Sequence, residues 1–139
     1  MTTDKIVGLL NDLSWNKPEE LQHVAREKLM QLNESELYLL MQPNGKDCWE
    51  NAALVLQEMG FPRVKPVIPQ MLFWIADLNW PGAHTIMEIL EGIDKDILLP
   101  HIQNSIKQAI SENDDSRLNW LKLLCRHVEI TEFNDLEID

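Results

Sequence analysis

The sequence predicts an all-α protein in which pairs of helices stack into a short superhelix. The first observation is a repeated string, because Asp-Leu-Ser-Trp at residues 12–15 returns as Asp-Leu-Asn-Trp at residues 77–80, and each copy opens a helical pattern with a proline near its start. The second is a series of four tryptophans that recur near the starts of apolar runs: Trp15, Trp49, Trp80 and Trp120. Their near-regular spacing fits two-helix units that bury their apolar faces against neighbouring units.

The first helix pair is expected over residues 18–42. Apolar side chains recur at three- and four-residue steps over residues 18–32, and Pro18 falls in the first turn, where its missing N–H group costs nothing. A short second helix should follow and should end before Pro43. Two residue pairs have the spacing of capping boxes, in which the two side chains bond each other's backbone N–H groups: Asn33 with Glu36, and Asp47 with Glu50.

The second helix pair is expected over residues 46–76. Its later half carries an apolar stripe over residues 64–75 that includes two prolines. A proline in a helix interior removes a backbone hydrogen bond and clashes with the preceding turn. The regular helix is therefore expected to begin at Pro66 or Pro69 and to end at Ala76.

The third helix pair is expected over residues 80–112, with Pro100 as an alternative start for its second helix. A last helix should end near residue 128, which gives seven or eight helices in one domain of residues 1–128, with the terminal pieces acting as caps. Residues 129–139 hold five acidic side chains and no basic one, so they are expected to form an acidic tail or cap.

The chain carries 12 basic and 23 acidic residues, and its net charge of −11 is unevenly placed. Residues 77–115 contribute −6 and residues 129–139 contribute −5, while the remainder is balanced. Negative charge repels phosphate backbones, which disfavours nucleic acid and anionic membranes and favours a basic protein partner. The alternative interpretation is a solvated surface that only keeps the protein soluble. The oligomeric state is left open.

The remaining composition favours a soluble, cytoplasmic protein. The N-terminus lacks a basic segment followed by an apolar run, and no apolar stretch approaches the ~20 residues of a membrane span. Cys48 and Cys125 lie far apart within helical runs and without a Cys-x-x-Cys motif. They are therefore expected to be reduced, buried thiols.

No catalytic or metal-binding pattern is apparent. Glu20 and His23 form a single Glu-x-x-His motif, whereas the di-iron helical bundles need two such motifs and further glutamates. The chain has neither a Gly-x-Ser-x-Gly turn nor a glycine-rich phosphate loop. We therefore expect no enzyme activity, metal or cofactor. The alternative is an enzyme or small-ligand binder with a pocket between helices, in which His84 or His101 would lie beside carboxylates.

The candidate binding surface lies where the acidic segment begins. His84, Glu88 and Glu91 of this surface share one helical face. Asp94 and Asp96 extend that face through the next turn, and Trp80 precedes it in the sequence. Such a surface would steer a basic protein toward it. Trp15 and Trp80 are expected at equivalent positions, with both rings buried against the neighbouring repeat.

Three strings resemble a known family: residues 72–83, residues 99–102 and residues 119–121, of which the Trp-x-x-Asp-Leu-Asn-Trp-Pro core is the most specific. They are similar to the bacterial domain-of-unknown-function family 5071, short all-helical proteins related to HEAT repeats. Residues 13–18 and 48–53 resemble N-terminal extensions of such proteins. The resemblance implies a HEAT-like helical-hairpin fold and brings no catalytic residue. Members resemble proteins encoded near bacterial toxin systems, which suggests a non-enzymatic, immunity or antitoxin-like inhibitor of a basic protein by analogy.

Overall fold

The structure is a computed structural model that describes residues 1–131, and every regular element in that range is helical. Seven α-helices follow one another: α1 (Thr3–Asn11), α2 (Glu19–Leu29), α3 (Trp49–Met59), α4 (Ile68–Trp74), α5 (Ala83–Glu91), α6 (Lys95–Ser111) and α7 (Asp115–His127). Three 3₁₀ segments lie between them: η1 (Glu34–Leu40), η2 (Lys46–Cys48) and η3 (Lys65–Val67). The all-α class is confirmed. Since η2 and η3 lead directly into α3 and α4, η1 is the eighth helix.

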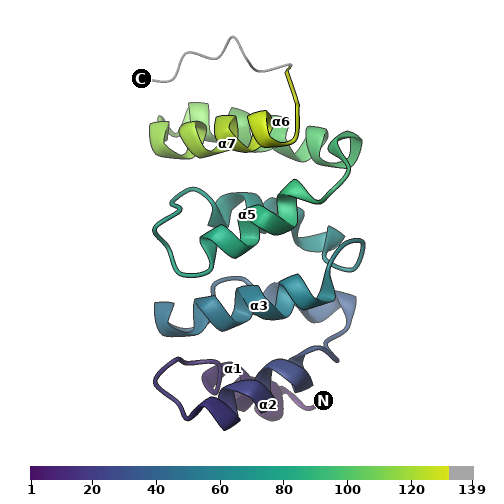
Figure 1. The fold of residues 1–139 in the computed structure, drawn as a ribbon, viewed down its shortest axis with the longest axis vertical. Helices are drawn as coiled ribbons and strands as arrows, with labels where there is room; N and C mark the ends of the chain where they lie inside the picture. Colours follow the sequence, from purple (N-terminus) through teal and green to yellow (C-terminus); the bar gives the residue numbers. More distant parts are fainter. Residues whose placement is uncertain (132–139) are drawn as a thin grey trace.

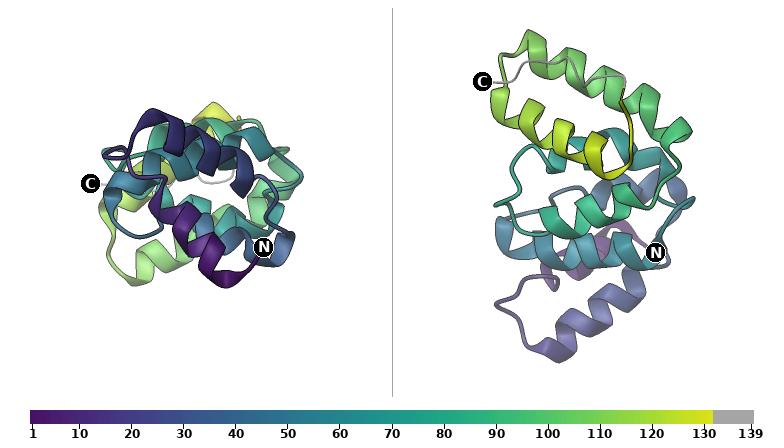
Figure 2. Two further views of the ribbon diagram at one scale, coloured as in Figure 1. Left: turned by 90° about the horizontal axis from the view of Figure 1, so that it is seen from below. Right: turned by 45° about the horizontal axis from the view of Figure 1, so that its top comes forward.

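The helices form four pairs stacked in one direction (Figure 1). The pairs are α1 with α2, η1 with α3, α4 with α5, and α6 with α7. In one layer α2, α3, α5 and α7 contact one another in turn, and in the other layer η1 meets η3 and α4 meets α6 (Figure 2). The second members of the pairs begin at nearly equal intervals along the chain, at Glu19, Trp49, Ala83 and Asp115.

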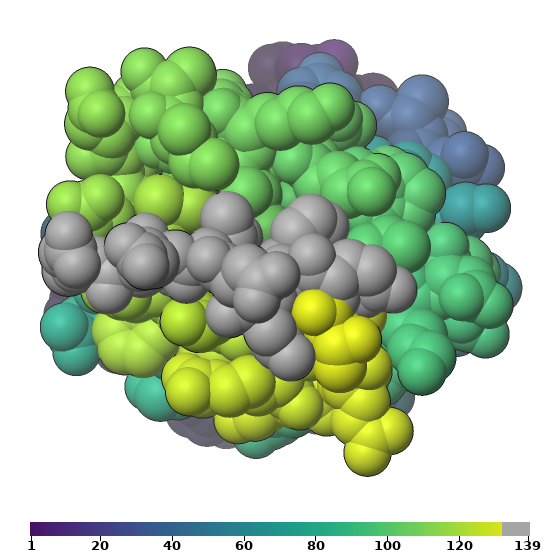
Figure 3. Space-filling view, turned by 90° about the horizontal axis from the view of Figure 1, so that it is seen from above, coloured from purple at the N-terminus to yellow at the C-terminus, as the bar shows by residue number. Residues whose placement is uncertain are grey.

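The expected pairing of the helices is wrong by one element. The sequence suggested that the helix over residues 18–32 pairs with the short helix after it, but α2 packs on α1, and η1 packs on α3. The terminal helices α1 and α7 are therefore full members of pairs. At the C-terminal end, α6 and α7 make up most of the visible surface (Figure 3). Whether the repeat is HEAT-like stays a prediction.

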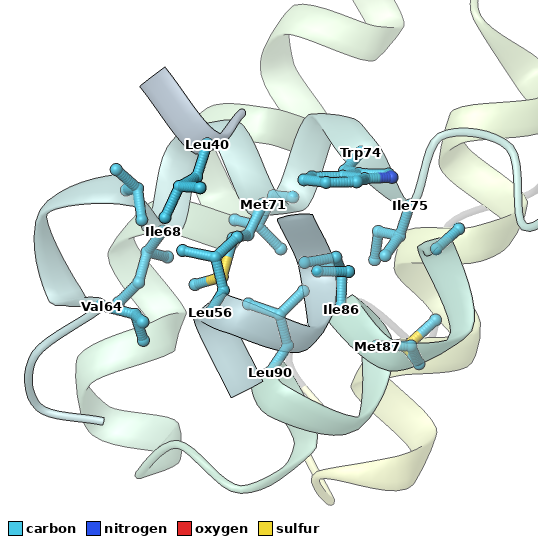
Figure 4. Close-up of a cluster of buried hydrophobic side chains, with 14 of the residues drawn as sticks. Leu40, Leu56, Val64, Ile68, Met71, Trp74, Ile75, Ile86, Met87 and Leu90 are labelled. Carbon is cyan, nitrogen blue, oxygen red and sulfur yellow. The ribbon is translucent and has the colours of Figure 1, made fainter. Parts of the chain in front are cut away.

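The core is one continuous cluster of apolar side chains that runs through all four pairs. Near its centre Leu56 of α3, Met71 of α4, and Ile86 and Leu90 of α5 point toward one another (Figure 4). All four are fully buried. Burying a side chain of this size contributes about 1.5–3 kcal/mol, so the stack is held together by these contacts between pairs.

The proline positions agree with the predicted helix boundaries in one case and not in the other. Pro66 lies in η3, and Pro69 lies in the first turn of α4, where a backbone N–H group has no partner within the helix in any case. Pro100, by contrast, lies inside α6, which continues through it without a restart. At 17 residues α6 is the longest helix, and no helix in the described range is long and apolar enough to cross a membrane.

One of the two expected capping boxes is formed. The backbone N–H of Asn33 donates to Glu36 Oε1 at 3.0 Å, and the Asn33 side chain bonds in return to the N–H of Glu36. At the other position Asp47 lies within η2, and Glu50 instead accepts a hydrogen bond from the N–H of Gly82 at 3.2 Å. A contact with a residue 32 positions away has replaced the local one.

The two copies of the repeated string form the same kind of turn. The Ser14 hydroxyl accepts the N–H of Asn16 at 3.1 Å, and Asp77 Oδ1 accepts the N–H of Asn79 at 2.8 Å. The structure therefore aligns Ser14 with Asp77, whereas the string match aligns Asp12 with Asp77. The repeat is present in the structure, but the string match lies two residues out of its register.

This shift in register overturns the prediction for the two tryptophans. Trp15 corresponds to Leu78, and Trp80 corresponds to Lys17: the backbone N–H groups of Lys17 and Trp80 donate to equivalent carbonyls, both at 3.0 Å. Trp15 is 51% exposed, so its expected burial is wrong, and Trp80 is half-buried. A short string match cannot determine which residue faces the neighbouring pair.

Ile130 lies within the expected acidic tail but is buried in the core, with its N–H bonded to the carbonyl of Cys125 at 2.8 Å. The boundary at residue 128 stays a prediction. The rest of the expected tail, residues 132–139, lies outside the described residues.

Candidate functional site

Trp80 belongs to a cluster of aromatic rings at the junction of α3, α4 and the turn before α5. Its ring lies 6.0 Å from that of Trp49 at an interplanar angle of 88°, and 6.0 Å from that of Phe73. Trp49 also meets Trp74 at 6.2 Å and 73°. Edge-to-face pairs contribute about 0.5–1.5 kcal/mol beyond area burial. Much of the Trp80 ring therefore serves to join α3 to the next helix pair.

The turn after Trp80 explains why its sequence is so specific. The Nε1–H group of the fully buried Trp74 donates to the carbonyl of Pro81 at 3.0 Å. Gly82 has a φ of +80°, and a Cβ atom there would lie 2.8 Å from the Ala53 Cβ and 2.9 Å from the carbonyl oxygen of Trp49. Only glycine fits this approach. The string from Trp74 to Gly82 is thus explained by packing.

His84, Glu88 and Glu91 lie exposed on one face of α5, as their spacing predicted. Glu88 Oε2 accepts a hydrogen bond from the Gln57 side chain of α3 at 3.1 Å. Glu91 Oε1 lies 2.7 Å from His127 Nδ1 of α7. The α5 face is therefore bridged to the helix on either side of it in the same layer.

Asp94 and Asp96 extend this face into the turn before α6, and both are exposed. Asp94 is the N-cap of α6, and its carboxylate accepts the N–H of Asp96 at 2.8 Å. We call Glu88, Glu91, Asp94 and Asp96 the acidic face. Within residues 1–131, no ion pair joins a lysine or an arginine to any of these four carboxylates.

Trp80 and His84 line a depression of about 320 Å³ together with Glu50, which is its one carboxylate. His101 lies in a separate depression of about 560 Å³, where Glu34 is the one carboxylate. The two histidines are thus not brought together. In the described part of the chain, no group of three histidine, cysteine, aspartate or glutamate residues could hold a metal ion.

Arg117 of α7 is a buried charge that the sequence interpretation overlooked. It is 3% exposed, and its Nη2 group donates to the Ser105 hydroxyl at 2.9 Å and to Gln108 Oε1 at 3.1 Å. Its guanidinium lies 5.3 Å from the centre of the Phe73 ring, and its Nη1 lies 3.6 Å from Glu112 Oε2. A buried charge needs such partners to offset the cost of leaving water.

The sequence did contain a signal for this burial. Arg117 precedes Leu121 by four residues and Leu124 by seven, so all three share the inward face of α7. An arginine at an apolar position of a helical stripe indicates a buried charge.

Both cysteines are buried thiols outside any disulfide, as expected. Burial and the neighbouring Asp47 carboxylate raise the pKa of the Cys48 thiol. The thiolate is the nucleophilic form, so a raised pKa leaves Cys48 unreactive near neutral pH. This thiol therefore has the environment of a structural residue.

Comparison with family sequence models finds a match over most of the chain. The sequence model of the domain of unknown function DUF5071 matches residues 41–137, a range that contains the whole junction and the acidic face. The strings at residues 72–83, 99–102 and 119–121 all fall within the match, while residues 13–18 precede it. Residues 48–53 also fall within the match, so the expectation that they belong to an N-terminal extension is wrong. No curated protein and no solved structure matches the chain. The chain therefore belongs to the DUF5071 family.

Proposed function

We propose that this protein is a non-enzymatic binding module whose acidic face docks a basic protein partner in the cytoplasm. The observation that carries the proposal is the group of four exposed carboxylates without a lysine or arginine counterion in the described chain. An immunity-type inhibitor of a toxin domain is its most concrete form. The bacterial origin and HEAT-like repeat suggested by the family resemblance belong to the same proposal.

Electrostatics supports this arrangement. Exposed charges are screened over a Debye length of about 8 Å at physiological ionic strength, so a cluster of like charges attracts a partner better than scattered ones. Complementary charge accelerates encounter, and its benefit falls as salt is added. Glu88 and Glu91 are held by Gln57 and His127, which limits their side-chain motion before binding.

Trp80 and His84 border the acidic face at its N-terminal end. Interface hot spots are enriched in tryptophan, and a half-buried ring can add apolar contact without rearranging. The carboxylates would then steer the partner, and Trp80 would contribute to its retention.

The test is to express the proteins encoded beside this gene and to measure the association rate of any basic toxin domain among them by biolayer interferometry at several salt concentrations. Glu88→Lys with Glu91→Lys should leave the far-UV circular dichroism spectrum unchanged and slow association by about tenfold or more at low salt. The matched control is Asp4→Lys with Glu20→Lys in the first helix pair, which changes the net charge by the same amount. Equal effects from both double variants would refute the acidic face as the docking surface.

A further inference from the structure

The layer that contains α4 and α6 carries a groove of its own. A depression of about 560 Å³ beside η3 shares Pro69 and His101 with a smaller one of about 100 Å³ along α6. The smaller one shares Pro69, Gln108 and Arg117 with a third of about 440 Å³ beside the end of η1. The three depressions thus form a row in which neighbours share lining residues, and we call this row the seam groove.

The charge of the seam groove is opposite to that of the acidic face. Its lining includes Arg63, Lys65, Arg117 and His101 but a single carboxylate, Glu34. In a chain with a net charge of −11, a groove lined in this way is unexpected. The guanidinium of Arg63 bonds the carbonyls of Met30 and Leu32, which hold its position without neutralising it.

Three buried side-chain nitrogens in the described chain have no hydrogen-bond partner, and all of them belong to residues of the seam groove. They are Gln42 Nε2, Arg117 Nε and Arg117 Nη1. More than nine-tenths of buried polar groups are satisfied in folded proteins, and leaving one unsatisfied is costly. Each of these three is a donor, so the missing partner is an acceptor.

A carboxylate is the acceptor that suits this position. It forms charge-assisted hydrogen bonds with guanidinium groups that are about twice as strong as neutral ones. The nearby Glu112 reaches Arg117 Nη1 only at 3.6 Å, and its side chain is half exposed. The Nε group and the Gln42 amide are left for another ligand.

We propose that the seam groove binds an extended acidic peptide segment, with one carboxylate received at Arg117 and Gln42. A peptide fits better than a small acid because the cationic side chains extend past the third depression, to Lys65 and Arg63 in the first. The side-chain amide of Gln70, which also lines the groove, can both donate to and accept from a peptide backbone. This binding is independent of the basic partner proposed for the acidic face.

The test is a nuclear magnetic resonance titration of the ¹⁵N-labelled full chain with acetylated, amidated hexaglutamate at low salt. We expect saturable shifts in the Arg117 Nε–H signal and in the side-chain amides of Gln42, Gln70 and Gln108. Hexalysine should leave these signals unchanged. Absent or non-saturating shifts with hexaglutamate would overturn the proposal. Citrate that binds as tightly as the peptide would overturn the peptide assignment and identify a small-acid site.

Charge-changing variants distinguish binding in the seam groove from a general effect of net charge. Lys65→Glu should weaken hexaglutamate binding by about tenfold at low salt, because an attraction becomes a repulsion. Lys5→Glu on α1 makes the same change in net charge away from the groove and should have little effect. Gln42→Glu supplies Arg117 with an internal acceptor, so it should abolish binding and raise the melting temperature. Equal weakening by Lys65→Glu and Lys5→Glu, or full binding by Gln42→Glu, would contradict the proposed site.

Discussion

Gly82→Ala is the substitution whose effect the structure determines most directly. At φ +80° an alanine adopts a left-handed backbone at a cost of about 1–2 kcal/mol. The added Cβ would lie 2.8 Å from the Ala53 Cβ and 2.9 Å from the Trp49 carbonyl oxygen. Overpacking of this kind costs about 1–3 kcal/mol. The free energy of unfolding should therefore fall by about 2–5 kcal/mol.

The two contributions can be separated by a second substitution. Ala53→Gly removes the closest atom, so Gly82→Ala should cost less in the Ala53→Gly background than in the parent, while it keeps the backbone strain and the contact with Trp49. Urea unfolding monitored by circular dichroism measures both variants on one scale.

Gly8→Ala in α1 is the matched control, because a Cβ there meets nothing within 4 Å. In a helix interior this change should stabilise the protein by about 0.5–1 kcal/mol. Should Gly82→Ala stay within about 0.5 kcal/mol of the parent, the size of a neutral surface change, the tight approach at this turn would be refuted.

Three further predictions concern the tryptophans and the buried thiol. Trp80→Ala should lower the free energy of unfolding by about 2–4 kcal/mol, because this ring packs against those of Trp49 and Phe73. Trp15→Ala should change it by less than about 1 kcal/mol, because Trp15 is exposed. Equal losses in urea unfolding would contradict this difference in packing. Cys48 should react with iodoacetamide at pH 8 much more slowly in the folded protein than in urea. Because its folded-state pKa is raised above the usual 9.0, the stability it contributes is present below pH 9 and is lost as the pH rises further, which unfolding curves between pH 7 and 10 would detect.

The acidic face shows what a local sequence pattern can predict and what it cannot. The spacing of His84, Glu88 and Glu91 predicted a shared exposed face, and this is confirmed. It could not predict that Gln57 and His127 would hold the two glutamates, since those residues are 31 and 36 positions away. Helical periodicity determines which side of a helix a residue occupies, and packing determines what lies opposite.

Arg117 shows the same division on the buried side. Its place in the apolar stripe of α7 was readable from the sequence, but its contact with Phe73 and its position in the seam groove depend on how α4, α6 and α7 meet. A local reading of the sequence was enough to predict the helical class, the Asn33–Glu36 capping box and the proline-limited start of α4, because these depend on atoms within about one helical turn. Tertiary packing was needed to establish which helices pair, which tryptophan is buried and why residue 82 is glycine. Those outcomes depend on close approach between segments that are far apart in the sequence, and a local pattern carries no information about that distance.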